Sequence, residues 1–165
     1  MGKVILICGM IGSGKTTYAN KLAKQLNAVT ITQDELMYGL FGTELYHKDL
    51  EQYYKYATWV EEYVKNKSGE AARAGAVVIC DNGFWSIQQR NDWRKFYADI
   101  GVTCELHYMD TAEEQRLKNI QKRNDAITRK ECNETFMQEK DIHHYFDVPS
   151  DGEITVAVAF NNTQL

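Results

Sequence analysis

One octapeptide constrains this chain more than any other feature. Gly9-Met10-Ile11-Gly12-Ser13-Gly14-Lys15-Thr16 is a complete GxxxxGK[ST] pattern, and it lies between an apolar run and a segment of good helical character. Glycines let a backbone turn tightly and bring its N–H groups onto phosphate oxygens, while the following helix adds the positive end of its dipole. The pattern therefore predicts a phosphate-binding loop for a nucleotide rather than a purely structural glycine turn.

The residues of this loop have separate expected roles. Lys15 is expected to reach the β- and γ-phosphates, and the Thr16 hydroxyl is expected to coordinate Mg²⁺. Backbone N–H groups are expected to hold the other phosphate oxygens. The residues predicted to contact the nucleotide are Gly9, Gly12, Ser13, Gly14, Lys15, Thr16 and Thr17.

Short apolar runs rich in β-branched residues recur along the chain. They cover 3–8, 28–32, 76–80, 102–109 and 154–158, and segments with helical spacing separate or follow them at 15–27, 50–74, 86–100, 111–124 and 133–145. Short strands of nearly continuous hydrophobicity are typical of a parallel sheet that helices cover on both faces. We therefore predict an α/β, three-layer P-loop NTPase fold with a five-stranded parallel sheet, in a single domain over residues 1–165.

Composition narrows the expected partners and location. With 19 Lys+Arg against 23 Asp+Glu the net charge is -4, and no long basic block occurs, so binding to duplex DNA is not expected. The longest apolar stretch is far shorter than the ~20 residues that span a bilayer. The four cysteines, Cys8, Cys80, Cys104 and Cys132, form no CxxC pair. We expect free thiols in a reducing compartment and, with them, a cytoplasmic location.

The sequence lacks the markers of other P-loop classes. GTPases of the common type carry NKxD and DxxG motifs, but 66–69 lacks the aspartate of the first and 81–84 misplaces the glycine of the second. A chain of 165 residues is also short for a large mechanical ATPase. A small phosphotransferase is the remaining expectation.

Two aspartates follow predicted strands, where the ligands of a doubly wound sheet bind. Asp81 ends the apolar run in the manner of a Walker B acid, which places it beside a metal held by Thr16; the alternative is an aspartate in a surface turn. Asp34 comes two residues after the second predicted strand and has two interpretations. It accepts or orients the proton of an acceptor hydroxyl, or it caps the helix that begins there.

The sequence resembles the small P-loop kinases grouped as AAA_33, which are related to the kinase domain of phage polynucleotide 5′-hydroxyl kinase and, more distantly, to adenylate, gluconate and chloramphenicol kinases. The likeness covers residues 3 to about 146. It lies in the octapeptide, in 32–36, in 81–86 with Arg90 and Arg94, and in 106–110, 123–124 and 127–129. It implies a nucleotide-kinase-like strand order 2-3-1-4-5, ATP and Mg²⁺ as cofactors, and a small lid near 124–133.

The resemblance also implies roles for single residues. In such kinases the acid matching Asp34 contacts the acceptor hydroxyl, the acid matching Asp81 lies by the metal, and arginines of a mobile lid close over the phosphates. Five of the six arginines of this chain lie between Arg90 and Arg129. We predict Lys15, Asp34, Arg123 and Arg129 as catalytic residues, Asp34, Asp81 and Arg90 as acceptor-binding residues, and Thr16 and Asp81 as metal ligands.

Aromatic residues crowd the segment between the second and third predicted strands, where related kinases hold the acceptor. Their rings are suited to stacking on a base or a sugar. The alternative, which we favour for the stripe Tyr53, Ala57, Val60 and Val64, is packing on the sheet at helical spacing. The adjacent His143 and His144 are not expected to bind a metal.

The expected activity is transfer of the γ-phosphate of ATP to a hydroxyl of a small molecule, a nucleoside or the 5′ end of a single-stranded nucleic acid. The alternative is an ATP-binding regulatory module, or an ATPase, without a phosphate acceptor. Such a module would not need Asp34, Asp81 or the lid arginines. No membrane partner is expected.

Overall fold

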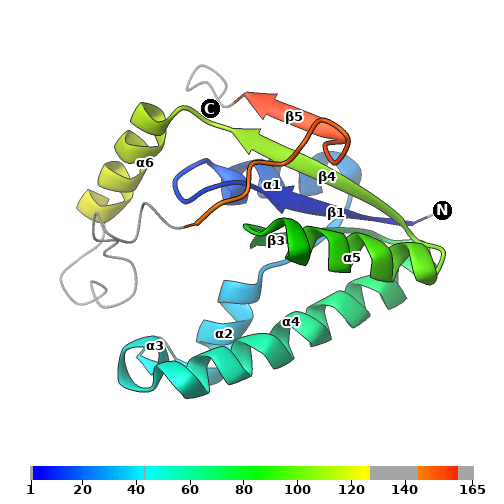
Figure 1. Cartoon of the computed structure of the whole chain (residues 1–165), viewed down its shortest axis with the longest axis horizontal. Coiled ribbons are helices and arrows are strands. Elements are labelled where there is room, and N and C mark those ends of the chain that lie inside the picture. The colour runs from blue at the N-terminus through cyan, green and yellow to red at the C-terminus, as the bar shows by residue number, and fades with distance from the viewer. Residues whose placement is uncertain (1, 43, 127–144, 160–165) are drawn as a thin grey trace.

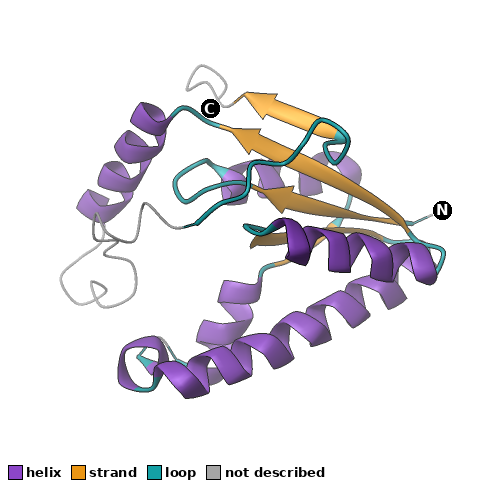
Figure 2. Cartoon of the chain, in the orientation of Figure 1, coloured by secondary structure: helices purple, strands orange, loops and turns teal. Residues whose placement is uncertain are grey.

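The structure is a computed structural model that describes residues 2–42, 44–126 and 145–159 (Figure 1). Helices and strands alternate over most of its length (Figure 2). In chain order the elements are β1 (Lys3–Cys8), α1 (Lys15–Leu26), β2 (Val29–Ile31), α2 (Gln33–Phe41), α3 (Leu45–Lys48), α4 (Leu50–Arg73), β3 (Val77–Gly83), α5 (Ile87–Asp99), β4 (Thr103–Asp110), α6 (Glu113–Ala126) and β5 (Val156–Ala159).

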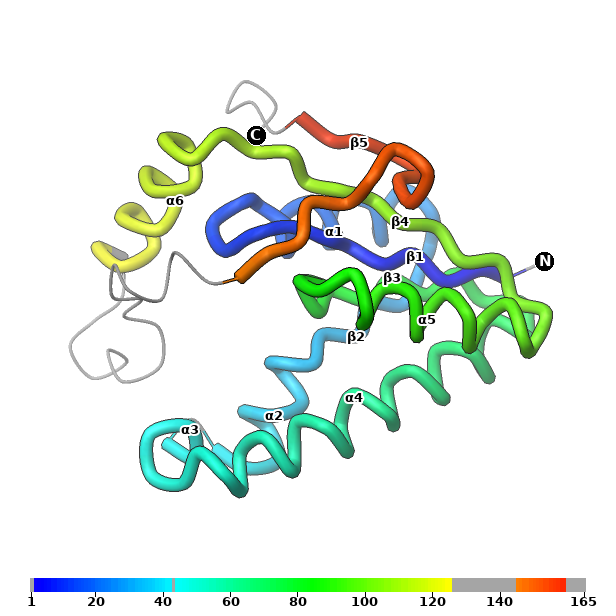
Figure 3. The backbone as a smooth tube through the Cα atoms, viewed as in Figure 1, coloured from blue at the N-terminus to red at the C-terminus, as the bar shows by residue number. Residues whose placement is uncertain are grey.

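The five strands form one parallel sheet in the order β2-β3-β1-β4-β5. β1 lies at its centre, where Ile5 pairs with Ile79 of β3 and with Glu105 of β4. The predicted fold class, strand number, direction and order are confirmed. Because the strands are parallel, their carboxyl ends meet at one edge of the sheet, beside the loop that joins β1 to α1 (Figure 3).

Alternate residues of β1 pack on opposite faces of the sheet, as the two-residue period of a strand requires. Val4, Leu6 and Cys8 belong to the larger core, to which α4 and α5 contribute, while Ile5 and Ile7 belong to a smaller core with α1. All five side chains are fully buried. Helices therefore cover both faces of the sheet, which is why its central strand has no polar alternation.

The α4 stripe packs as predicted. Val60 and Val64 are buried in the larger core, and Tyr53 and Ala57 pack against it. This result confirms the core interpretation of the stripe. Other aromatic residues of α4 point outward, since more than half of the surface of Tyr54, Trp59 and Tyr63 is exposed.

The element boundaries differ most from the sequence-based ones in two regions. β3 continues to Gly83, three residues past the apolar run, because Cys8 of β1 pairs with Gly83 after a register shift. Helices α2 and α3 occupy most of 33–48, where sequence analysis placed no more than the start of a helix. All but the last residue of the predicted helix 133–145, and most of the predicted lid, lie outside the described residues.

Three cysteines, Cys8, Cys80 and Cys104, are free thiols, and Cys132 lies outside the described residues. Burial raises the pKa of each of the three to about 12, so these thiols stay protonated and unreactive at neutral pH. Among the helices that the structure describes, none has the length and apolarity needed to cross a membrane.

Candidate active site

The loop between β1 and α1 is shaped by its glycines and by α6. Gly14 caps α1 with a φ of 87°, and Gly12 has a φ of 75°, both in the left-handed region that favours glycine. A Cβ on Gly12 would lie 2.6 Å from the carbonyl oxygen of Arg116 in α6. Asn119 of α6 also donates to the Gly12 carbonyl oxygen at 2.8 Å. The loop is therefore clamped in one conformation by a neighbouring helix.

Two further contacts brace the loop through its carbonyl oxygens. The Arg116 guanidinium donates to the carbonyl oxygen of Ile11 at 3.3 Å, and the Thr111 hydroxyl donates to that of Ser13 at 3.0 Å. Arg116 is 5% exposed, so its guanidinium is held inside the protein against the carbonyl oxygen of Ile11. Because these partners bind carbonyl oxygens, the bracing does not use the amide groups that a phosphate would need.

Lys15 lies among charged groups from three other elements. Its ammonium donates to the carbonyl oxygen of Met10 at 2.8 Å. Burial lowers the pKa of Lys15, the charges of Asp81 and Asp34 oppose that change, and the charge of Arg123 adds to it. The structure therefore brings the predicted residues Lys15, Asp34, Asp81 and Arg123 within electrostatic range of one another.

Thr16 and Asp81 are in direct contact. The Thr16 hydroxyl donates to Oδ2 of Asp81 at 2.7 Å, and Asp81 is only 5% exposed. Burial raises the pKa of Asp81, and the Thr16 hydrogen bond and the Lys15 charge oppose it. Asp81 is thus part of the site and not an aspartate of a surface turn.

The donor set beside the loop fits Mg²⁺ and a polyphosphate. A hydroxyl and one carboxylate are hard oxygen ligands, and Mg²⁺ in such sites takes its other ligands from water and phosphate. In the described part of the chain no three His, Cys, Asp or Glu residues gather into a metal cluster, so an all-protein cage is not the arrangement here. Ser13 supports the fit, because its buried hydroxyl oxygen has no hydrogen-bond partner among the described residues.

Asp34 lies in the first turn of α2, and the N-cap of that helix is Thr32. The capping interpretation of Asp34 is therefore wrong. Burial raises the pKa of Asp34, repulsion from Asp81 raises it further, and Lys15 opposes both. A carboxylate whose pKa is raised is a stronger base than one at its ordinary pKa.

Two contacts fix the start of α2 and with it the position of Asp34. Oδ1 of Asn82 accepts a hydrogen bond from the backbone N–H of Gln33 at 3.1 Å, in the role of a helix cap supplied by another strand. The Gln33 side chain donates to the carbonyl oxygen of Ala57 in α4 at 3.0 Å. Residue 33 is thereby tied both to β3 and to α4.

A family comparison adds to this geometry. The model of the AAA_33 family, described as an AAA domain, matches residues 4–145. The chain belongs to the AAA_33 family. No curated protein is similar enough to count as a relative.

Solved structures share the fold of this AAA_33 protein at low sequence identity. The APS kinase CysC of Mycobacterium tuberculosis, solved with AMPPNP and APS, is 20% identical with a TM-score of 0.68, over 96% of this chain and 88% of that one. A gluconokinase from Sinorhizobium meliloti is 14% identical with a TM-score of 0.61, over 95% and 82%. A chain of the Pnkp1/Rnl/Hen1 RNA repair complex is 21% identical with a TM-score of 0.68, over 86% and 42%.

Arg123 and Tyr53 extend the site of this AAA_33 protein beyond the loop. Partial burial lowers the pKa of Arg123, and the charge of Tyr38 opposes that change. Burial raises the pKa of Tyr53 to about 12, with Asp34 and Tyr38 adding to the rise. Tyr53 therefore lies within electrostatic range of both Asp34 and Tyr38. Arg129, the other predicted catalytic arginine, lies outside the described residues.

Arg90 does not have the predicted place in acceptor binding. Its side chain is fully buried and forms an ion pair with Glu153, with Nε 2.9 Å from Oε1. Nη1 also donates to the carbonyl oxygens of Phe84 at 3.1 Å and of Asp147 at 2.9 Å. Arg90 thus connects the loop after β3 to the segment that leads into β5. Each nitrogen of its guanidinium has a hydrogen-bond partner inside the protein.

Sequence analysis missed two residues of this site. It assigned no role to Asn82, whose only sequence signal was its position directly after Asp81. The Nδ2 group of Asn82 is buried without a hydrogen-bond partner among the described residues. It also missed Asn119. Nothing in a helical sequence indicates which side-chain amide will donate a hydrogen bond to a loop that lies more than 100 residues earlier in the chain.

Proposed function

We propose that the protein is an ATP- and Mg²⁺-dependent phosphotransferase that moves the γ-phosphate of ATP to a hydroxyl group. The observation that carries the proposal is a second acid, Asp34, whose charge couples to Lys15 and to the Asp81 carboxylate that contacts Thr16. A protein that only binds a nucleotide needs the phosphate-binding loop and has no need of an acid at the position of Asp34. An acid whose pKa burial raises, placed by Asn82 on a separate helix, is suited to a hydroxyl nucleophile.

Each residue has a part in this mechanism. Lys15 binds the β- and γ-phosphates, and Thr16 and Asp81 hold the metal, which neutralises charge on the phosphate oxygens when it is bound. Asp34 accepts the hydroxyl proton of the acceptor and orients its oxygen toward the phosphoryl group. Arg123 supplies positive charge to the group in transfer, a role that suits guanidinium geometry.

A transfer assay tests the proposal. Wild type, Asp34→Ala and Glu35→Ala are incubated with γ-labelled ATP and a panel of nucleosides, 5′-hydroxyl oligonucleotides and hydroxylated metabolites. Glu35 is the matched control because it is the neighbouring acid of the same helical turn and is exposed. We expect label on one acceptor class, its loss in Asp34→Ala with ATP affinity unchanged, and normal transfer by Glu35→Ala.

Three results would contradict the proposal or the role that it gives to Asp34. Tight ATP binding without transfer to any acceptor would favour a nucleotide-binding regulatory module. ATP hydrolysis that Asp34→Ala leaves intact would favour an ATPase without an acceptor. A collapse of ATP affinity in Asp34→Ala would assign Asp34 to nucleotide binding and remove it from acceptor activation.

A further inference from the structure

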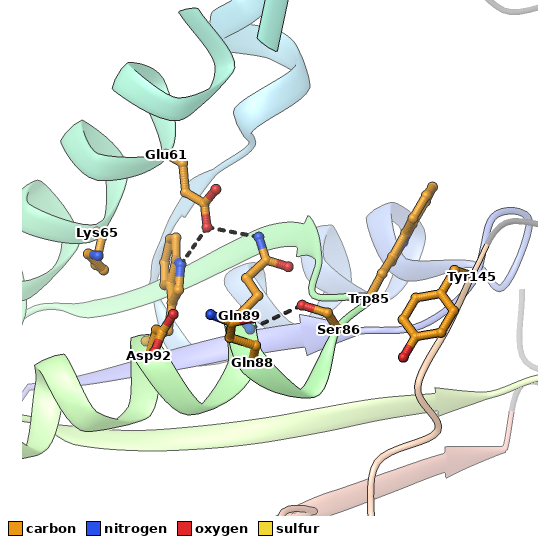
Figure 4. A pocket seen from close by; sticks show the side chains of 9 residues that line it. Glu61, Lys65, Trp85, Ser86, Gln88, Gln89, Asp92 and Tyr145 are labelled. Atoms are coloured by element: carbon orange, nitrogen blue, oxygen red, sulfur yellow. Dashed lines mark hydrogen bonds between the residues drawn. The ribbon is translucent and has the colours of Figure 1, made fainter. Parts of the chain in front are cut away.

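A pocket of about 570 Å³ lies between α4 and α5, separate from the residues that the phosphate-binding loop brings together (Figure 4). Side chains from two helices and from the loop after β3 surround it, together with one tyrosine from the segment that precedes β5. The lining residues are Glu61, Lys65, Trp85, Ser86, Gln88, Gln89, Asp92, Trp93 and Tyr145.

The polar groups of this pocket are held in place by one another. Oε1 of Glu61 accepts hydrogen bonds from Nε1 of Trp93 and from Nε2 of Gln89, each at 2.8 Å (Figure 4). Within the described part of the chain, Oε2 of Glu61 and Oε1 of Gln89 accept no further hydrogen bond. The pocket therefore has two preset acceptor oxygens, and the exposed carboxylate of Asp92 adds to them.

The chemistry of the lining favours a ligand that carries many hydrogen-bond donors. Acceptor oxygens outnumber the cationic donor Lys65, and the lining has one more negative than positive charge, which disfavours a phosphate chain. The exposed ring of Tyr145 supplies an apolar face at the same pocket (Figure 4). A polyhydroxylated ring combines hydroxyl donors at its rim with C–H groups on its faces.

The pocket is connected to the proposed hydroxyl site through α4 and the loop after β3. Tyr53, beside Asp34, precedes Glu61 by eight residues on α4, which corresponds to about 12 Å along the helix. The Trp85 indole lies against the backbone of Gly83, where an added Cβ would be 2.6 Å from Nε1. Asp81 belongs to the same strand.

We propose that this pocket is the subsite for the non-reacting end of the acceptor and that it binds a sugar ring. The proposal rests on the proposed function, because it assigns the reacting hydroxyl to Asp34. It specifies an acceptor of at least two units, with the reacting hydroxyl at one end and a sugar ring at the other. This deepens the proposed function from any hydroxyl compound to a glycosylated one.

The test measures binding directly and transfer separately. Maltose, sucrose, a 5′-hydroxyl dinucleotide and inorganic pyrophosphate are titrated by saturation-transfer NMR against wild type and Gln88→Ala/Asp92→Ala, which changes only two exposed pocket residues. Glu62→Ala and Asn91→Ala are the matched controls, since each is exposed and neighbours a lining residue without lining the pocket. We expect the disaccharide Kd to rise about tenfold in the pocket variant and to be unchanged in the controls.

The outcomes separate this proposal from the proposed function. Disaccharide binding that depends on Gln88 and Asp92, together with transfer, supports the subsite; the same binding without transfer to any acceptor leaves a sugar-binding pocket but overturns its assignment to the acceptor along with the kinase proposal. Transfer that depends on Asp34 while KM is unchanged in the pocket variant overturns the subsite and keeps the kinase. Binding of only the dinucleotide or pyrophosphate through these residues, or of none of the probes, also overturns it.

Discussion

Buried charge occurs in two regions of this molecule, and the two regions differ in how that charge is balanced. In the Arg90–Glu153 pair, burial acts to raise the pKa of Glu153, but hydrogen bonds from Arg90 and Ser150 outweigh it and hold the pKa below its ordinary value. Beside the phosphate-binding loop the balance is the reverse. Burial prevails there, so the pKa of Lys15 is lowered and that of Asp34 is raised.

The difference shows which charges belong to the fold and which are available to a ligand. A buried pair that supplies its own counter-charge and hydrogen bonds holds two segments together. A cluster of charges whose burial is not balanced by counter-charges and hydrogen bonds lowers the stability of the free protein. A ligand of complementary charge offsets that loss when it binds. On this basis Arg90 is structural, and we propose that Lys15, Asp34 and Asp81 form the functional set.

Lys15→Met gives the largest expected effect, and it acts on activity. Loss of the ammonium removes the group proposed to bind the β- and γ-phosphates, so transfer should fall on the order of 10³-fold and ATP affinity should fall with it. The unfolding temperature of the free protein should change little, because burial disfavours the charged form of Lys15 and removal of the cation relieves that cost. Labelled-ATP transfer and a thermal melt measure the two quantities.

Lys24→Met is the matched control for this variant, because Lys24 is an exposed lysine of the same helix. It should transfer phosphate at the wild-type rate. Normal turnover by Lys15→Met would contradict the assignment of the loop, and a large loss of unfolding temperature would place Lys15 with the structural charges.

Arg90→Met should have the next largest effect, and it acts on stability. The substitution leaves Glu153 buried without its partner. It also removes the hydrogen bonds that Arg90 donates to the carbonyl oxygens of Phe84 and Asp147. We expect a loss of about 3–5 kcal/mol in the free energy of unfolding, measured by urea denaturation. Replacing both members, as Arg90→Met/Glu153→Met, should recover much of that loss because no buried charge remains.

Arg94→Met serves as the control on the same helix, where Arg94 is only half-buried and should contribute little. A stable Arg90→Met protein that loses acceptor binding would restore the sequence-based prediction for Arg90. It would also remove the distinction between the two regions.

The residues that sequence analysis placed correctly are those whose signals are local. The loop motif is contiguous and the strand positions follow from apolar runs, so both could be predicted from the sequence, while the strand order came from the family resemblance. Asp81 followed from its position at the end of an apolar run. Its contact with Thr16, 65 residues away, needed only that β1 and β3 be neighbours.

The residues that were missed or misassigned depend on packing between distant segments. Glu153 lies 63 residues after Arg90, and no pattern in either segment shows that the two will pair. The polar end of β3 could not be predicted from hydrophobicity, because Asn82 and Gly83 join the strand only through pairing with β1. Asp34 was ambiguous for a related reason, since its environment is set by Asn82 and α4 rather than by its own helix.

Gly12→Ala tests the rigidity of the functional region, with a smaller expected effect. Its φ of 75° disfavours any side chain, and the new Cβ would lie 2.6 Å from the carbonyl oxygen of Arg116. We expect a loss of about 2 kcal/mol in unfolding free energy together with weaker ATP binding, because the loop must move away from α6. Gly39→Ala is the control: a Cβ there meets nothing within 4 Å, and alanine favours the helix.

Glu153→Gln gives the smallest expected effect and tests the structural pair through pH. The folded-state pKa of Glu153 is depressed, so its contribution is present above the unfolded pKa and is lost as pH falls through the folded pKa. Glutamine keeps the shape and one acceptor but no charge, so the variant should be about 1 kcal/mol less stable at pH 7. That difference should shrink toward zero on acidification, as urea unfolding at a series of pH values would show. Glu62→Gln, at an exposed position, should show no difference at any pH. A wild-type advantage in stability that persists in acid would mean that Glu153 acts through its shape alone. The difference between Glu153 and the two acids Asp34 and Asp81 would then not be electrostatic.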